Sequence, residues 1–204
     1  MSFEMKPLAT LKRMLRQCAM NSNPDYRFVD RFMDFLTGRA YIFDHLGSIN
    51  ERVVYAAIRY AALERKVNHI IIDSMMKCVK GSDDCSSQKD FMNSITRMAQ
   101  QYGVHIHVVH HIKKLESEEC LPNKFDLKGD SSISDMPDQV LTVWRNKRKE
   151  RAIKKSPTDP KANEAEDALL VCDKNRHGEW EGHVRLWYHP PSLQYTADSR
   201  CMPL

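Results

Sequence analysis

The stretch His69-Ile70-Ile71-Ile72-Asp73-Ser74 decides the fold of this chain. Its isoleucines form a β-branched apolar run, which is typical of a strand buried on both faces in a parallel sheet. The run follows residues 50–66, where apolar residues recur at helical spacing and predict a helix. A helix followed by a buried strand is the repeating unit of α/β proteins, and we expect Asp73 to end the strand.

The neighbouring segments continue this alternation. Residues 1–5 read as the end of another buried strand, which carries Glu4 to the edge where α/β sheets bind ligands. Polar, turn-rich residues 112–137 predict a binding loop or disorder, and residues 147–166 a charged linker or flap. The remaining helices are predicted at residues 7–21, 25–36 and 89–102, and the remaining strands at residues 41–44, 104–111, 139–144, 167–173 and 183–188.

The composition suits one domain, because 204 residues with 42% hydrophobic side chains can bury a sizeable core. No apolar run approaches the roughly 20 residues of a membrane span, and no leader opens the chain. We therefore expect a cytoplasmic protein without a membrane partner. Six cysteines are scattered without a C-x-x-C pair, which predicts reduced thiols. The net charge of +4 is concentrated between Arg145 and Lys155, where a polyanion could bind.

Asp73 and a group of histidines are the first candidates for chemistry. A carboxylate held at a strand's carboxyl end can bind hydrated Mg²⁺ in a nucleotide site, although an Asp there can also simply form a turn. His105, His107 and His111 would share one face of the strand at residues 104–111, and His110 the other. The group suggests a metal, but no carboxylate or Cys stands at a ligand spacing, which favours one polar residue that senses a phosphate.

Five segments, taken in order, resemble the successive motifs of the superfamily 4 ring helicases. This family includes the DnaB-type helicases, the phage primase–helicases and mitochondrial Twinkle, and it has a RecA-like ATPase core. The resemblance extends from Ser2 to about Tyr195. The segments are residues 3–5, 70–73, 108–114, 126–133 with Asp138 and Val140, and 173–178.

The resemblance implies a role for each matching residue at the nucleotide. Glu4 matches the glutamate that orients or deprotonates the attacking water. Asp73 matches the Walker B Asp that holds Mg²⁺ through water, and His111 matches the residue that senses the γ-phosphate of ATP. Lys174 and Arg176 match a pair in which Arg reaches the nucleotide of the neighbouring subunit, so a hexameric homo-oligomer is implied.

The resemblance also implies a DNA-binding surface. Lys113 and residues 126–133 match the loops that line the ring's channel and hold single-stranded DNA by its phosphates, with Lys128 and Gly129 as the best candidates. Ser131 stands where the family usually has a second Gly, so the loop departs from the family pattern. Residues 147–166 form a longer and more charged insertion than many members have.

The phosphate-binding loop of the family does not occur in this sequence. No G-x-x-x-x-G-K-[ST] run is present in the 204 residues, and the family places that run just before the strand that ends at Glu4. We therefore expect an N-terminally truncated domain. In the complete protein, a P-loop segment or a primase is expected upstream of it. Little ATP hydrolysis is expected from the isolated chain, because nothing in it holds the triphosphate.

The sequence thus predicts an α/β fold, a RecA-like three-layer sandwich with a mostly parallel sheet, over residues 1–195, followed by a tail over residues 196–204. The predicted function is that of an ATP-dependent helicase domain that moves on single-stranded DNA in replication, with ATP and Mg²⁺ as cofactors. A bacterial or phage-encoded cytoplasmic protein is expected rather than one of an organellar matrix. Two alternatives stay open: a non-catalytic ring or single-stranded-nucleic-acid-binding protein, and an α/β metalloenzyme that uses the His-rich strand.

Overall fold

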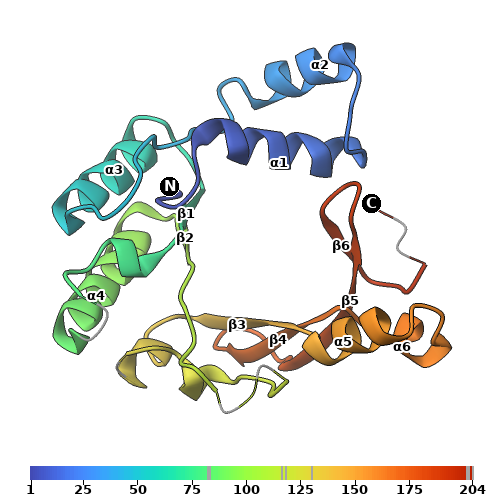
Figure 1. Cartoon of the computed structure of the whole chain (residues 1–204). Coiled ribbons are helices and arrows are strands. Elements are labelled where there is room, and N and C mark those ends of the chain that lie inside the picture. Colours follow the sequence, from blue (N-terminus) through green and yellow to red (C-terminus); the bar gives the residue numbers. More distant parts are fainter. Residues whose placement is uncertain (82–83, 116, 118, 130, 201–202, 204) are drawn as a thin grey trace. The chain divides into compact units, whose positions relative to one another are not determined.

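The computed structural model describes residues 1–204 except 82–83, 116, 118, 130, 201–202 and 204 (Figure 1). The chain forms two compact units, described separately below. The first unit contains Met1–Leu11, Met33–Lys113 and Leu127–Pro137. The second unit contains Lys12–Phe32, Lys114–Asp126 and Asp138–Leu204.

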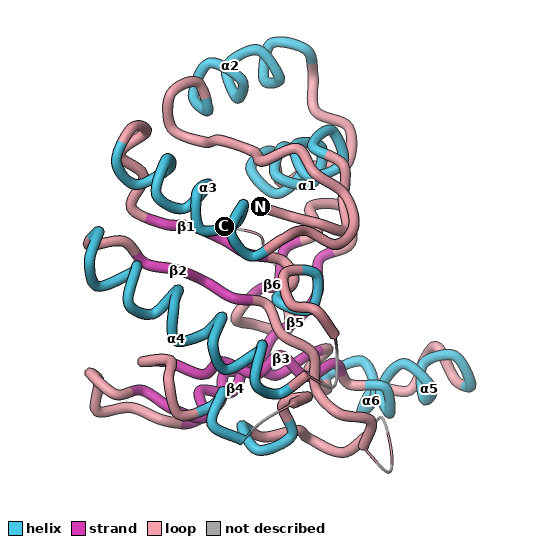
Figure 2. Tube along the Cα trace, turned by 90° about the vertical axis from the view of Figure 1, so that its left-hand side faces the viewer, coloured by secondary structure: helices cyan, strands magenta, loops and turns pink. Residues whose placement is uncertain are grey.

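The first unit is built on the order α3 (Glu51–Leu63), β1 (His69–Ile72), α4 (Cys85–Tyr102) and β2 (His105–Val108). Helix α4 begins where the Asp84 side chain accepts a hydrogen bond from Ser87 N at 2.9 Å. It ends at Gly103, whose φ of 62° is the left-handed conformation that closes many helices. A helix between two strands allows them to run parallel, and β1 and β2 do so side by side (Figure 2).

The core of the first unit lies between this sheet and the two helices. Ile70 and Ile72 of β1 are buried against α3 and α4, whereas His69 and Ile71 point to the exposed face. Phe91 of α4 is fully buried and stacks on Tyr55 with ring centroids 5.8 Å apart. The apolar run around Asp73 was expected to be buried on both faces, but one face is exposed.

The amino-terminal residues extend the small parallel sheet. Asp73 N donates to Met1 O at 2.9 Å, and Phe3 N donates to Asp73 O at 2.7 Å. Ser2 forms parallel bridges with Asp73 on one side and with Asp44 on the other. The strand predicted at residues 41–44 is therefore reduced to a single bridge at Asp44.

The second unit contains an antiparallel sheet in the order β3 (Gln139–Arg145), β4 (Ala168–Asn175), β5 (Gly182–His189) and β6 (Gln194–Thr196). The prediction of a mostly parallel sheet therefore holds for the first unit and is wrong for this one. Val140 and Thr142 of β3 are buried while their neighbours are exposed, as expected for a sheet with one solvated face. Thr196 is buried at the end of β6, so the predicted tail begins inside a strand.

Two helices replace the predicted linker or flap at residues 147–166. They are α5 (Lys147–Lys155), capped by Asn146, and α6 (Pro160–Glu164), capped by Asp159. Helices α1 (Pro7–Ala19) and α2 (Tyr26–Leu36) form where predicted. Short 3₁₀ turns complete the fold at Met75–Lys77, Lys124–Asp126 and Ser131–Ser134. The chain was predicted to form a single domain over residues 1–195. The structure groups its residues into two compact units, and the single domain stays a prediction.

The cysteines take part in no disulfide within the described residues. Cys18, Cys78, Cys85, Cys120 and Cys172 are free, and Cys201 lies outside the described residues. Burial raises the pKa of Cys78 to about 12, so this thiol stays protonated and unreactive at neutral pH. Within the described part of the chain, no helix has the length and apolar character needed to cross a membrane.

Candidate active site

Glu4 and Asp73 lie next to each other at the carboxyl edge of the parallel sheet in the first unit. The backbone bonds between residues 1–3 and Asp73 place Glu4 one residue beyond the paired segment. Val109 N donates to Ile72 O at 2.9 Å, and Met75 N donates to Val109 O at 3.0 Å. The ends of three neighbouring segments therefore meet here, where ligands of α/β proteins bind.

Two serines tie these carboxylates to each other's segment. Ser2 Oγ donates to Asp73 Oδ2 at 3.0 Å, and Ser74 Oγ donates to Glu4 Oε1 at 3.3 Å. Ser74 is fully buried, whereas Glu4 is exposed, so the bond holds one carboxylate oxygen of a side chain that remains open to solvent. Sequence analysis missed both serines, because a hydroxyl beside a carboxylate forms no periodic pattern.

The side chains at this edge suit a hydrated Mg²⁺. Asp73, Glu4, Ser2 and Ser74 offer only oxygen atoms, the ligand type that Mg²⁺ prefers. Asp73 is partly exposed, and Ser2 occupies only one of its two carboxylate oxygens. One or two carboxylates are enough for a Mg²⁺ that keeps several waters and binds nucleotide phosphates.

His111 and the predicted DNA-binding loop are joined by backbone contacts. Lys128 N donates to His111 O at 2.9 Å, and Ile112 forms an antiparallel bridge with Leu127. The structure thus brings together the residue predicted to sense the γ-phosphate and one of the lysines predicted to hold DNA. Lys113 follows this bridge and is exposed.

His110, which the sequence analysis left without a role, strengthens this junction. Its Nε2–H donates to the Lys128 carbonyl at 2.5 Å, while its Nδ1 is buried without a hydrogen-bond partner among the described residues. Burial lowers the pKa of His110, although the Lys128 carbonyl acts in the opposite direction. A neutral ring that donates through Nε2 therefore holds the loop at neutral pH.

Gly129 lies against α4 with no room for a side chain. Its φ is +115°, and a Cβ added there would lie 1.9 Å from Oε1 of the buried Gln88. Glycine suits this position because a side chain at this positive φ is strained and its Cβ would displace the end of the buried Gln88 side chain. Of the predicted loop at residues 126–133, Asp130 lies outside the described residues.

We expect Gly129→Ala to destabilise the first unit by about 1–3 kcal/mol, since it adds a steric clash and backbone strain. Urea unfolding of the variant measures this loss. Gly47→Ala is the matched control, because Gly47 also has a positive φ of +88° but no atom within 4 Å of the added Cβ. Equal unfolding midpoints for the two variants would show that contact with α4 does not constrain the loop.

Lys174 and Arg176 lie in the second unit, Lys174 within β4 and Arg176 just beyond it. Arg176 Nη1 pairs with Asp138 Oδ1 at 2.8 Å, and Arg176 N donates to Asp138 O at 2.8 Å. His177 Nε2 lies 3.4 Å from the same carboxylate oxygen. The Arg176 side chain is 45% exposed, so this ion pair is open to solvent. Action of Arg176 on a neighbouring subunit's nucleotide stays a prediction.

The histidines that suggested a metal form a different group from the one expected. His105 and His107 stack with His69 of β1 on the exposed face of the sheet, and His69 Nδ1 lies 3.2 Å from His107 Nε2. Burial, followed by the nearby His105 and His69, lowers the pKa of His107. In the part of the chain that the structure describes, no three His, Cys, Asp or Glu side chains are placed to hold a metal ion.

The first unit thus defines an α/β protein with two carboxylates and a histidine along one edge of its parallel sheet. A family model described as an AAA domain matches residues 1–117, more than half of the chain, and the chain belongs to this family. A comparison with curated proteins finds no match. Membership of this family supports the prediction of an ATPase-type function that depends on nucleotide. The matched residues include Glu4, Asp73 and His111.

Proposed function

We propose that the chain acts as part of an ATP-dependent DNA helicase of superfamily 4, with a RecA-like core that moves along single-stranded DNA as a ring. The carrying observation is the sheet edge of the first unit, where Glu4 and Asp73 end neighbouring parallel segments and His111 follows the next strand. These are the positions at which phosphoryl transfer needs a residue that orients water, a Mg²⁺ ligand and a phosphate sensor.

Each residue has a defined task at this edge. Glu4, whose Oε1 accepts a hydrogen bond from Ser74, also accepts one from the attacking water and orients it. Asp73 would hold Mg²⁺ through water, and the ion would supply positive charge beside the nucleotide phosphates. Ser2 fixes one Asp73 oxygen and leaves the other free for that contact.

The junction between His111 and Lys128 supports coupling of nucleotide to DNA. A shift of His111 towards a γ-phosphate moves its carbonyl, to which Lys128 N is bonded. Lys113 follows Ile112 and Lys128 follows Leu127, and the bridge between Ile112 and Leu127 joins their two loops. A movement of His111 would therefore reach both loops together. This gives a direct route from the triphosphate to the phosphates of single-stranded DNA.

The proposal is tested by joining the chain, at Met1, to a segment that carries a G-x-x-x-x-G-K-[ST] loop, since residues 1–204 contain none. ATP hydrolysis is measured with and without single-stranded DNA, and strand separation on a forked duplex. Asp73→Asn is expected to lower hydrolysis at least about tenfold. The matched control Asp90→Asn, an exposed residue of α4, keeps the parent rate.

Two outcomes contradict the proposal. Parent-level hydrolysis by Asp73→Asn would remove the Mg²⁺ assignment. Binding of single-stranded DNA without hydrolysis or strand separation by the joined protein would favour a non-catalytic nucleic-acid-binding ring instead.

A further inference from the structure

Helix α5 carries an unusual density of positive charge for a helix of nine residues. Its sequence, KRKERAIKK, contains six Lys or Arg residues and one acidic residue, Glu150. The function proposed above does not use this helix. Its cations fall into two groups with different surroundings, those bound to the body of the second unit and those that point to solvent.

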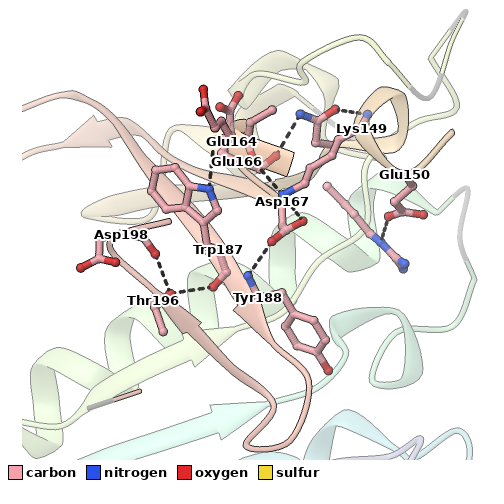
Figure 3. Close-up of polar contacts among 12 residues, drawn as sticks. Lys149, Glu150, Glu164, Glu166, Asp167, Trp187, Tyr188, Thr196 and Asp198 are labelled. Atoms are coloured by element: carbon pink, nitrogen blue, oxygen red, sulfur yellow. Dashed lines mark hydrogen bonds and ion pairs between the residues drawn. The ribbon is translucent and has the colours of Figure 1, made fainter. Parts of the chain in front are cut away.

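One cation anchors the helix. The Lys149 side chain is only 6% exposed, and its Nζ lies 2.7 Å from Asp167 Oδ1 and 2.6 Å from the Ala165 carbonyl (Figure 3). Asp167 Oδ2 accepts a hydrogen bond from Tyr188 N at 2.8 Å, which ties the pair to β5. The Asn146 side chain caps the helix at Lys149 N and donates to Glu166 O at 3.0 Å.

This anchor holds α5 in one orientation on the second unit. A buried lysine is costly unless it is paired, and here both its charge and its hydrogen bonds are satisfied. The Trp187 indole also donates to Glu164 O at 3.3 Å, which fixes the end of α6. The exposed face of α5 is therefore ordered before any partner binds, so binding loses less conformational entropy.

The outward cations outnumber the carboxylates near them. Glu150 forms ion pairs with Arg145 and Lys147, and Arg151 Nη1 pairs with Glu119 Oε1 at 2.7 Å. Three further cations are exposed and, among the described residues, form no ion pair: Arg148, Lys154 and Lys155.

The spacing of these cations gathers them on one side of the helix. Arg148, Arg151 and Lys155 recur at i, i+3 and i+7, and Lys154 lies beside Arg151. Seven residues of helix rise by about 10 Å, a length over which one strand of a nucleic-acid duplex carries about three phosphates. The apolar residues of α5, Ala152 and Ile153, are both partly buried. The helix therefore lacks the exposed apolar face with which amphipathic helices enter membranes.

We infer that the exposed face of α5, formed by Arg148, Arg151, Lys154 and Lys155, is a second nucleic-acid-binding surface that contacts the phosphate backbone. It is distinct from the proposed channel loops, because it lies in the second unit and needs neither nucleotide nor Mg²⁺. Backbone contacts of this kind bind without reading sequence. The surface would keep hold of a strand while the loops at Lys113 and Lys128 release and rebind it.

The test compares two triple variants of the full chain. The α5 variant carries Arg148→Gln, Lys154→Gln and Lys155→Gln. The matched control carries Lys12→Gln, Arg13→Gln and Arg185→Gln, which removes the same charge from exposed positions elsewhere in the second unit. Binding of a fluorescent oligothymidylate is measured by anisotropy from 50 to 300 mM salt, without nucleotide. Far-UV circular dichroism and thermal unfolding confirm that both variants fold.

The α5 variant is expected to bind about tenfold or more weakly at 50 mM salt, with a plot of log affinity against log salt that is shallower by about two units. The control keeps the parent's affinity to within about twofold, since distant charges act only through the general field. An α5 variant that binds with the affinity and salt dependence of the control would overturn the inference. If the α5 variant loses binding to vesicles of anionic phospholipid but still binds DNA like the parent, the inference is overturned and α5 is a membrane-binding surface instead.

A further variant separates this inference from the proposed function. Lys113→Gln with Lys128→Gln removes the channel-loop cations and leaves α5 unchanged. Hydrolysis is measured in the protein joined to a P-loop segment. If this variant then loses DNA-stimulated hydrolysis but retains most of its nucleotide-independent binding, both the helicase proposal and the α5 inference are supported. If the joined parent protein does not hydrolyse ATP while the α5 variant still loses DNA binding, the helicase proposal fails and the α5 surface remains.

Discussion

Arg176→Ala is expected to lower DNA-stimulated ATP hydrolysis by about 10³-fold or more in a ring assembled with a P-loop segment. A guanidinium that reaches the nucleotide of a neighbouring subunit stabilises charge on the phosphoryl group only while it is transferred. The loss should therefore appear in kcat rather than in nucleotide affinity. Arg176→Lys should recover little of it, because lysine keeps the charge but not the planar fork of donors.

The ion pair between Arg176 and Asp138 provides the controls for this prediction. Both side chains are about half exposed, so loss of the pair costs about 1 kcal/mol or less, and Arg176→Ala should stay folded. Asp138→Asn removes the ion pair but keeps the guanidinium, and should keep most of the activity. Arg185→Ala removes an exposed arginine from β5 in the same unit. A rate for Arg176→Ala equal to that of Arg185→Ala would disprove the finger assignment.

Glu4→Gln is expected to lower hydrolysis by about 10²- to 10⁴-fold while nucleotide binding stays near the parent level. Glutamine keeps the size of the side chain and can still accept from Ser74 Oγ, but it cannot take a proton from water. Single-turnover hydrolysis separates this chemical step from product release. Binding of a fluorescent ATP analogue measures the affinity independently.

Two further variants show whether the position of Glu4 matters. Glu64→Gln makes the same chemical change at an exposed residue just beyond α3 and should leave the rate unchanged. Ser74→Ala removes the hydroxyl that orients Glu4, and should lower kcat by less than Glu4→Gln does. Parent-like hydrolysis by Glu4→Gln would mean that another group orients the water.

The sequence predicted the first unit well because its signals are local. The β-branched run before Asp73 and the helical spacing of residues 50–66 are sufficient to predict β1 and α3. The antiparallel second unit was not anticipated, because the sequence of β3 does not alternate apolar and polar residues as its burial does. Leu141 and Val143 lie on the exposed face, whereas Thr142 is buried.

The contacts that the sequence could not predict are tertiary. Helix α5 has only two apolar residues, so its periodicity gives little signal, and it is held by its Asn146 cap and by Lys149 on Asp167. The serines that bind Glu4 and Asp73 come from different segments, which only folding brings together. The motifs suggested roles for individual residues, but not which neighbours position them.

The pairing of Ser2 with Asp73 also bears on the order in which this protein folds. These residues are 71 positions apart, whereas β4, β5 and β6 pair with their nearest neighbours along the chain. Closing a long loop costs entropy before its contacts form, so local hairpins generally appear first. The carboxylate edge should accordingly be among the last features to mature, and pulse-labelled hydrogen exchange should find the amides of Phe3 and Asp73 protected later than those of β5.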